Sequence, residues 1–380
     1  MKHYDYIFSG TGLAALMTLN QMVKSGGFSD KKILLLDQDA KQTNDRTWCF
    51  WETGKGAWDK ILTQKWRYVW FKNENSSRKM DLSPYEYKMI RGIDFYNKIL
   101  KRIALQSNIE FVQCRVTGYS ESAGNVVVQT DADDFSCRKL FNSVYDQKPV
   151  LEQTGFPLLQ QHFVGWRVKT ETPSFDPNVA TFMDFSVPQK GNTRFMYVLP
   201  VSDTEAIVEY TLFSKDLLPQ HEYEAAITAY LSDLHIANYK IVEKERGSIP
   251  MTSYRFWKHN TKNIVHIGSA GGWTKASTGF TFKNSDKLSK RLVHFLQRQA
   301  DFSKFHKNDR FWFYDLLLLD ILSENNEKGA MIFSAMFRKS HPALILKFLD
   351  GETTLYEDLQ VIWQCPKGLF IRALVRRIFR

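Results

Sequence analysis

The start of the chain combines two short apolar runs with a longer amphipathic segment. Residues Tyr4–Ser9 and Lys32–Leu36 are apolar runs of strand length. Between them, apolar side chains in Leu13–Val23 recur at helical spacing, and the glycines that follow Ser25 close the segment. Because an apolar period of three to four residues is typical of a helix, the pattern predicts a βαβ unit.

The rest of the chain changes pattern twice. A helical period returns after the first strands, alternating strand patterns dominate from about residue 160 to 213, and the region after Ser285 is largely helical. The predicted elements are a helix over 93–106, strands near 109–113 and 125–130, a helix over 222–234, a strand over 263–267 and a buried helix over 311–322.

This order predicts an α/β chain with an inserted sheet-rich substrate domain of the α+β kind. A chain of 380 residues is long enough for about two domains. We expect a Rossmann-type dinucleotide-binding domain from residues 1–75, 90–155 and 255–300. Residues 76–89 and 156–254 would form the substrate domain, and 301–380 a helical C-terminal region.

The first turn of the βαβ unit carries the motif G-x-G-x-x-A. Gly10 permits the tight turn, Gly12 lets a pyrophosphate approach the backbone, and Ala15 lets the helix pack closely on the strand. Asp37 ends the second strand, where it can bind ribose hydroxyls. The motif predicts a nucleotide on the helix N-terminus; the alternative is a tight turn without a ligand.

A second glycine-rich segment, HIGSAGGWTKASTGFTF, spans residues 266–282. Again a predicted strand runs into small residues, here Gly268, Gly271 and Gly272, and then into a predicted helix. Two such segments far apart in the chain indicate one extended cofactor held from two sides. FAD fits better than NAD, because its ribityl and isoalloxazine groups need a second backbone approach. The alternative is a close-packed turn between a strand and a helix.

Charge is concentrated at the C-terminus. The net charge is +10, and residues 366–380 contain five basic and no acidic side chains. On a helical wheel the apolar and basic side chains of this tail separate, which predicts a basic amphipathic helix suited to an anionic membrane surface. The apolar half comprises Phe370, Ile371, Leu374, Val375, Ile378 and Phe379, and the basic half Arg372, Arg376, Arg377 and Arg380. The alternative is a terminal helix docked on the core with a solvated basic face.

Other composition features restrict the function. Four cysteines without a CxxC pair predict no disulfide scaffold and a reducing cytoplasm, and nine histidines without zinc spacing predict no metal site. We expect no signal peptide and no transmembrane helix, because no apolar run approaches 18 residues. No recognition motif accompanies the basic charge, so we expect no nucleic-acid partner.

Several uncommon strings resemble bacterial lycopene β-cyclases, from Tyr4 to about Ser285. They are NDRTWCFWE at 44–52, QHFVGW at 161–166, MDF at 183–185, FMYVLP at 195–200, EAIVEYTLFS at 205–214, GSIPMT at 247–252 and IGSAGGWTKASTGFTFKNS at 267–285. The resemblance implies a flavoprotein of the glutathione-reductase-like superfamily that binds FAD, needs it reduced by NAD(P)H, and converts lycopene through γ-carotene to β-carotene. This cyclisation is started by a proton and is redox-neutral, so the enzyme would be an isomerase.

The resemblance also implies site residues. Glu209 occupies the place of the family's essential acidic residue, and a desolvated carboxyl has a raised pKa suited to an acid; the alternative is an exposed glutamate paired with a lysine. Asp184 is a second catalytic candidate, as a helper in proton relay. The sequence has Ser186 where many relatives have arginine. Arg46 would lie beside FAD.

Three tryptophans, Trp48, Trp51 and Trp273, are candidates for contacts with the polyene. Since lycopene is an insoluble hydrocarbon, the resemblance favours a peripheral enzyme on the cytoplasmic face of the membrane, near other carotenoid enzymes. Two rival functions remain open from sequence. One is an FAD-dependent monooxygenase or isoprenoid reductase of the same fold, and the other is a non-catalytic flavin-binding scaffold.

Overall fold

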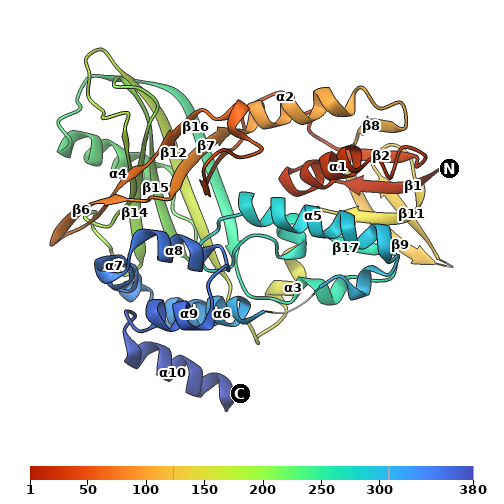
Figure 1. The fold of residues 1–380 in the computed structure, drawn as a ribbon. Coiled ribbons are helices and arrows are strands. Elements are labelled where there is room, and N and C mark those ends of the chain that lie inside the picture. The colour runs from red at the N-terminus through yellow and green to blue at the C-terminus, as the bar shows by residue number, and fades with distance from the viewer. Residues whose placement is uncertain (123, 307–308, 380) are drawn as a thin grey trace.

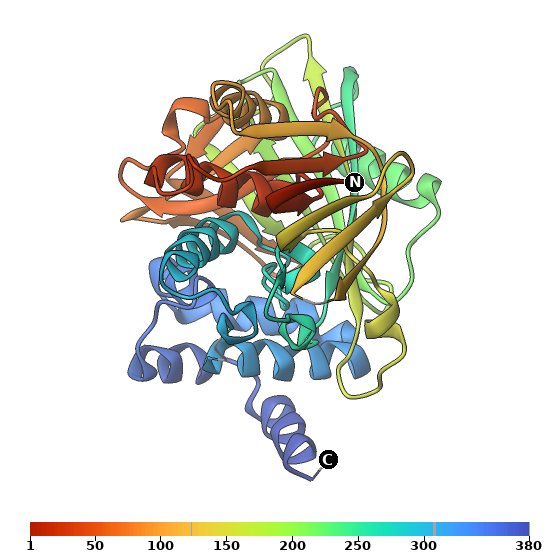
Figure 2. The same cartoon turned by 90° about the vertical axis from the view of Figure 1, so that its right-hand side faces the viewer.

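The structure is a computed structural model that describes residues 1–122, 124–306 and 309–379. Arg380 of the predicted basic tail lies outside these residues. Two large sheets stand beside each other, a small sheet lies between them, and the C-terminal helices pack below (Figures 1 and 2). The helices are α1 Leu13–Ser25, α2 Gly92–Ile103, α3 Lys148–Leu151, α4 Gln220–Asp233, α5 Phe282–Arg298, α6 Arg310–Glu324, α7 Gly329–Lys339, α8 Pro342–Leu349, α9 Leu355–Ile362 and α10 Lys367–Ile378.

The first sheet has the strand order β8-β2-β1-β11-β10-β9, and β17 also pairs with β11. Its strands are β1 Lys2–Ser9, β2 Ile33–Asp37, β8 Ile109–Gln113, β9 Val116–Ser122, β10 Asn125–Thr130, β11 Phe135–Asn142 and β17 Ile264–His266. Strands β8, β2, β1, β11 and β17 are parallel, and the central strand β2 is an apolar run because both of its faces are covered. The predicted βαβ unit is confirmed as β1, α1 and β2.

Strand β11 brings the two glycine-rich segments together. Its first half pairs with β10 and its second half with β17, so the chain after β17 emerges beside the start of α1. A Cβ atom on Gly268 would lie 3.3 Å from the Cβ atom of Ala14. The helix predicted after these small residues is α5, although it does not follow them directly. A short 3-10 helix over Gly268–Gly271 is followed by turns at Gly272 and Gly279, whose φ angles are +68° and +72°, and α5 begins only at Phe282.

The second sheet has the order β16-β12-β15-β14-β13-β5-β6 and is antiparallel except where β13 meets β5. Its strands are β5 Tyr68–Asn73, β6 Ser76–Asp81, β12 Leu159–Thr170, β13 Val179–Asp184, β14 Thr193–Pro200, β15 Glu205–Ser214 and β16 Tyr239–Met251. The expected boundary after residue 75 falls in the turn between β5 and β6. Because β5 pairs with β13, residues 68–73 belong to the second sheet and not to the first.

Each face of the second sheet has its own core. On β15, Val208, Tyr210 and Leu212 pack in the cluster that α4 covers, whereas Ile207 and Phe213 belong to the cluster on the other face. The small sheet, formed by β3 Thr47–Thr53, β4 Gln64–Trp66 and β7 Tyr85–Arg91, joins this second cluster through residues such as Tyr87.

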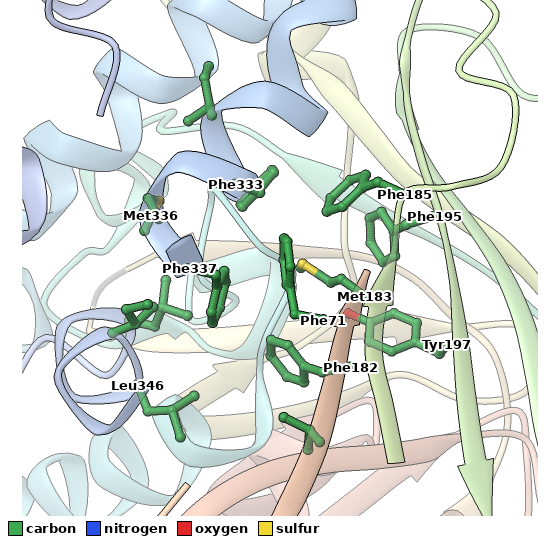
Figure 3. Close-up of a cluster of buried hydrophobic side chains, with 14 of the residues drawn as sticks. Phe71, Phe182, Met183, Phe185, Phe195, Tyr197, Phe333, Met336, Phe337 and Leu346 are labelled. Carbon is green, nitrogen blue, oxygen red and sulfur yellow. The ribbon is translucent and has the colours of Figure 1, made fainter. Parts of the chain in front are cut away.

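Aromatic side chains bind the C-terminal helices to the inner face of the second sheet. Phe71, Phe182, Phe185 and Phe195 come from the strands, and Figure 3 shows them facing side chains of α7 and α8. The rings of Phe71 and Phe337 stack with centroids 4.7 Å apart. These rings therefore fill a core, and α6 is buried along Leu316–Leu322 as the sequence predicts. Among the described helices, none is both long and apolar enough to cross a bilayer.

Candidate functional site

A cavity of about 540 Å³ lies between the two large sheets, and all three sheets contribute to its walls. Gly10, Gly12 and Gly268 line it from the first sheet, and Glu209 and Glu245 from the second. The remaining predicted residues on its wall are Asp37, Arg46 and Trp48. The fold thus brings both glycine segments and the predicted acidic residue to one cavity.

The start of α1 forms a cradle for an anion. At Gly10 the φ angle is +83°, and a Cβ atom would lie 2.4 Å from Oγ of Ser143. At Gly12 a Cβ atom would have no neighbour within 4 Å, so this side of the backbone is open. The first turn of α1 has neither an acidic residue nor a side-chain cap, and its N–H groups are suited to a phosphate. Ala15 is buried in the helix interface, 1% exposed, as its predicted packing role requires.

Asp37 reinforces the same turn. Its Oδ2 accepts hydrogen bonds from the Thr11 amide at 2.6 Å and the Thr11 hydroxyl at 2.8 Å, and Lys41 lies 3.6 Å away. The carboxylate lines the cavity while it holds the glycine turn in place. Arg46 is exposed at the cavity wall and donates a hydrogen bond to the carbonyl of Asp45.

Three further polar side chains on the cavity wall fit a bound group. Within the described chain, Oε1 of Gln161, Oγ1 of Thr278 and Oγ of Ser285 are buried and have no hydrogen-bond partner. Buried polar atoms without a partner are rare in proteins. Their position beside the glycine cradle fits a cofactor that extends from α1 toward the second sheet, as FAD would.

Glu209 stands on β15 with its side chain facing the cavity. Burial raises the pKa of its carboxyl, the nearby Glu245 adds to this, and a hydrogen bond from Thr211 opposes both effects, which leaves the pKa at about 8. That bond joins the Thr211 hydroxyl to Oε1 of Glu209 at 2.6 Å. The carboxyl therefore keeps its proton near neutral pH, and the alternative of an exposed glutamate paired with a lysine is wrong.

Aromatic and weakly acidic side chains surround Glu209. Tyr197 is its partner across the β14–β15 ladder, and Tyr87 and Cys49 line the same cavity from the small sheet. Burial raises the pKa of the Cys49 thiol to about 12 and the pKa values of both tyrosines well above their usual value. These neighbours stay uncharged, so they do not neutralise a carboxylate.

Asp184 lies elsewhere. It pairs with Met196 on the sheet face that packs against α4, opposite to the face of Glu209. Its Oδ2 accepts a 2.8 Å hydrogen bond from Tyr230 of α4, and its Oδ1 accepts from the amide and hydroxyl of Ser186. Lys72 lies 3.7 Å away. Asp184 does not line the cavity, so a relay to Glu209 has no support in this geometry.

Two predicted tryptophans also differ from expectation. Trp51 is 2% exposed and donates its indole N–H to the Leu346 carbonyl at 3.1 Å. Trp273 is 4% exposed and packs in the core of the first sheet. Neither lines the cavity, whereas Trp48 does. Gly271 and Gly272 also lie behind the wall, where a Cβ atom on Gly271 would come within 2.1 Å of the His266 carbonyl oxygen. These glycines therefore serve backbone packing instead of cofactor contact.

The sequence model of the lycopene cyclase protein family matches residues 5–375. The chain belongs to this family. Two curated relatives of the cyclase family are both lycopene β-cyclases. The enzyme from Pseudescherichia vulneris is 21% identical, with 95% of this chain and 94% of that one aligned. The enzyme from Paracoccus sp. (strain N81106 / MBIC 01143) is 29% identical over 126 residues, and this match spans 32% of each chain.

Solved structures show that this cyclase-family chain has the glutathione-reductase-like fold of FAD-dependent flavoproteins. A geranylgeranyl bacteriochlorophyll reductase-like protein from Thermoplasma acidophilum has a TM-score of 0.62 at 10% identity, covering 99% of this chain and 100% of that one. A variant of the halogenase PltM in complex with FAD has a TM-score of 0.54 at 12% identity, covering 94% and 83%. At these identities the likeness concerns the fold.

The glycine cradle of this cyclase-family chain yields a first prediction. Gly12→Ala should leave the free energy of unfolding of the apoprotein within about 0.5 kcal/mol, because its methyl group meets no protein atom. The methyl group would occupy the approach of a phosphate, so FAD binding should be lost. Flavin fluorescence titration and thermal unfolding measure the two effects.

Two variants control this experiment. Gly10→Ala should lose FAD binding and also about 1–3 kcal/mol of stability, because φ is +83° there. Gly368→Ala in helix α10, where a methyl group also meets no atom, should leave FAD binding unchanged and should not lower stability. Unchanged flavin affinity in Gly12→Ala would place the cofactor elsewhere.

The position of Asp184 yields a second prediction. Asp184→Asn should cost about 1–3 kcal/mol in the free energy of unfolding, because a buried, charged acceptor of three hydrogen bonds becomes neutral. Turnover per folded molecule should stay within a few-fold of the wild type. A turnover loss as large as that of a Glu209 variant would restore Asp184 to the catalytic machinery.

Proposed function

We propose that this chain is a lycopene β-cyclase that converts the linear ψ ends of lycopene into β-ionone rings by proton-initiated cyclisation. The observation that carries the proposal is the Glu209 carboxyl, which retains its proton in a cavity shared with the glycine cradle. Membership of the lycopene cyclase family supports the substrate class.

Glu209 is the proposed proton donor. A carboxyl with a pKa of about 8 is protonated at neutral pH and can give its proton to the terminal double bond of a ψ end group. The Thr211 hydroxyl holds Oε1, which leaves Oε2 without a hydrogen bond in the described chain and able to face the substrate. Ring closure forms a C–C bond and a tertiary carbocation. The Glu209 carboxylate then accepts the proton that leaves the ring, so atoms and electrons balance as an isomerisation.

The cavity suits a carbocation in two ways. Rings of Tyr197, Tyr87 and Phe280 line it, and aromatic π faces attract positive charge. Apolar side chains of Leu199 and Ile207 limit water, which would otherwise trap the cation. Two successive cyclisations at the opposite ends of lycopene would give γ-carotene and then β-carotene.

FAD is the proposed cofactor, held at the N-terminus of α1 with Asp37 and Arg46 nearby. The FAD complex of a structurally similar halogenase supports this choice, as do the unpartnered atoms of Gln161, Thr278 and Ser285. Bound in its reduced form, FAD would place negative charge beside the cation. NAD(P)H is the proposed reductant.

The C-terminal helix α10 supports a membrane partner, in an orientation that the helical wheel did not predict. Two of its arginines face the protein: Arg377 binds both carboxylate oxygens of Asp320 on α6, and Arg376 pairs with Glu324. Phe370 packs against the core, but most of the other apolar side chains face outward, with Ile378 67% and Phe379 85% exposed. Figures 1 and 2 show α10 projecting from the body of the protein.

This orientation is the reverse of a terminal helix with a solvated basic face. The preceding helix, α9, exposes Leu355, Leu359 and Trp363 as well, while Arg372 and Lys367 remain exposed for anionic headgroups. We propose that α9 and α10 insert apolar side chains into the cytoplasmic face of a bilayer. The enzyme would then take lycopene from the membrane, where other carotenoid enzymes would be its neighbours.

The proposed acid yields a third prediction. Glu209→Gln removes the transferable proton at nearly constant volume, so the conversion of lycopene to β-carotene should fall by about 100-fold or more. FAD content should not change. Pigment analysis of lycopene-producing cells and flavin absorbance measure these quantities.

The matched control is Glu205→Gln, which alters a carboxylate on the same strand that pairs with Arg167 instead of facing the cavity. It should retain cyclisation. Full β-carotene formation by Glu209→Gln would contradict the assignment. NAD(P)H consumed in proportion to product would instead favour a monooxygenase or reductase, and unchanged behaviour in every assay would favour a flavin-binding scaffold.

The exposed side chains of α10 yield a fourth prediction. The double variant Ile378→Glu with Phe379→Glu should reduce binding to anionic phospholipid vesicles by about tenfold or more, because two exposed apolar side chains no longer insert. Its turnover of detergent-solubilised lycopene should persist. Leu105→Glu, at an 82% exposed site after α2, serves as control, and equal vesicle binding by all three proteins would refute the docking surface.

A further inference from the structure

Two glutamates face each other across a glycine in the second sheet. Gly165 on β12 pairs with Glu209 on β15 and also with Glu245 on β16. The two glutamates therefore stand two strand spacings apart, about 9.6 Å between backbones, on the same face. Their side chains project over the one position between them that has no side chain.

The Glu209 carboxyl leans into the space above this glycine. A Cβ atom on Gly165 would lie 3.5 Å from Cβ, Cγ and Oε2 of Glu209. The carboxyl thus lies over β12, on the path toward Glu245, and both residues line the cavity. Glycine at position 165 leaves no side chain between the two carboxyl groups.

Glu245 is anchored from another sheet. Its Oε1 accepts a hydrogen bond of 3.0 Å from the backbone amide of Thr47 on β3. An amide donor stabilises the charged form of a carboxyl. Burial raises the pKa of Glu245 above its usual value, the hydrogen bonds from Thr47 and the guanidinium of Arg46 oppose this effect, and the neighbouring Glu243 adds to it. Within the described residues, the Glu209 carboxyl accepts a hydrogen bond only from a hydroxyl group, that of Thr211.

The other groups around Glu209 do not supply a positive charge. Tyr197 on β14, Tyr87 on β7 and Cys49 on β3 are neutral near pH 7. Within the described residues, no lysine, arginine or histidine nitrogen lies within 4.0 Å of either carboxyl. The guanidinium of Arg46 acts on Glu245 but forms no ion pair with it in the described part of the chain. Two carboxylates this close together repel each other, so the pair favours a single negative charge.

We propose that Glu245 is a positioning residue for the acid: its carboxylate, held on the Thr47 amide, keeps the proton of the pair on Glu209. The proposal rests on the proposed function, in which Glu209 donates that proton. Glu245 itself need not touch the substrate. Its role is to fix which of the two carboxyl groups is protonated.

The test is Glu245→Gln in the full-length, FAD-loaded protein. Without the second carboxylate, the Glu209 proton is held less tightly, so the Glu209 pKa should fall by about one unit or more. Acid catalysis requires the protonated form, which exists below this pKa. The alkaline limb of the pH–rate profile should therefore move to lower pH by the same amount, while the maximal rate at the lower pH is retained.

A second readout does not depend on activity. The carbonyl stretch of the protonated Glu209 carboxyl, assigned by its absence in Glu209→Gln, can be titrated by infrared difference spectroscopy. Its midpoint should fall in Glu245→Gln and return toward the wild-type value in Glu245→Asp, which keeps the charge. Glu205→Gln should leave the midpoint unchanged.

The outcomes separate the two proposals. An unchanged infrared midpoint in folded Glu245→Gln would overturn the role of Glu245, whether or not the protein is active. Undiminished cyclisation by Glu209→Gln would overturn the proposed function instead. If Glu245→Gln does not fold, the comparison between wild type and Glu245→Asp decides: the shorter carboxylate lies farther from Glu209 and should lower the midpoint, and an unchanged midpoint would overturn the role of Glu245.

Discussion

A desolvated carboxyl group that has no cation within 4.0 Å among the described residues is the constraint on which the rest of the site depends. An ionised Glu209 would lack both water and a partner charge, so its neutral form is favoured. Such a group is tolerated because protonation removes the cost, and the same protonation makes it an acid. The apolar inner face of the second sheet, the uncharged tyrosines and the helices behind them all maintain that condition.

Two parts of the fold keep water away from Glu209. The C-terminal helices pack on the inner face of the second sheet through stacked rings such as Phe71 and Phe337, which closes one side to water. The glycine segments of the first sheet close another side with backbone, and a Cβ atom at Gly268 would already touch Ala14. A cofactor in this cradle would bring its far end toward Glu209, because both line one cavity.

Local sequence patterns predicted the helices and strands well, but they predicted poorly which face of an element each side chain occupies. The βαβ unit, the meeting of two glycine segments and the cavity position of Glu209 follow from apolar periods and motif strings. Asp184 shows the limit. Regular alternation would place it on the same face as Phe182, but the register of β13 shifts between Thr181 and Asp184, which turns the carboxylate toward α4. No pattern in the sequence predicts this shift in the register of β13.

Other residues were overlooked or predicted wrongly for the same reason, because their surroundings depend on contacts between distant parts of the chain. Glu245 escaped notice because its meaning depends on Gly165, which lies 80 positions earlier and pairs with it only in the sheet. Trp273 stands among small residues, which suggested an open site, yet the positive φ of Gly272 turns the chain so that the indole packs in the core. Residues 68–73 carry no local sign that β13 will be their neighbour.

The C-terminal helix shows why a helical wheel needs a docking partner before it can be interpreted. The wheel separates apolar from basic side chains correctly, but the acidic residues of α6 decide which half faces inward. Asp320 is 8% exposed and binds Arg377 with both oxygens, an arrangement that fixes the orientation of the helix as well as its position. Apart from Phe370, the apolar half is left exposed, where contact with water is unfavourable and contact with a bilayer would not be. Under the proposed function the substrate partitions into lipid, which would give that exposed surface a role, because an enzyme acting on such a hydrocarbon would meet it where it is dissolved.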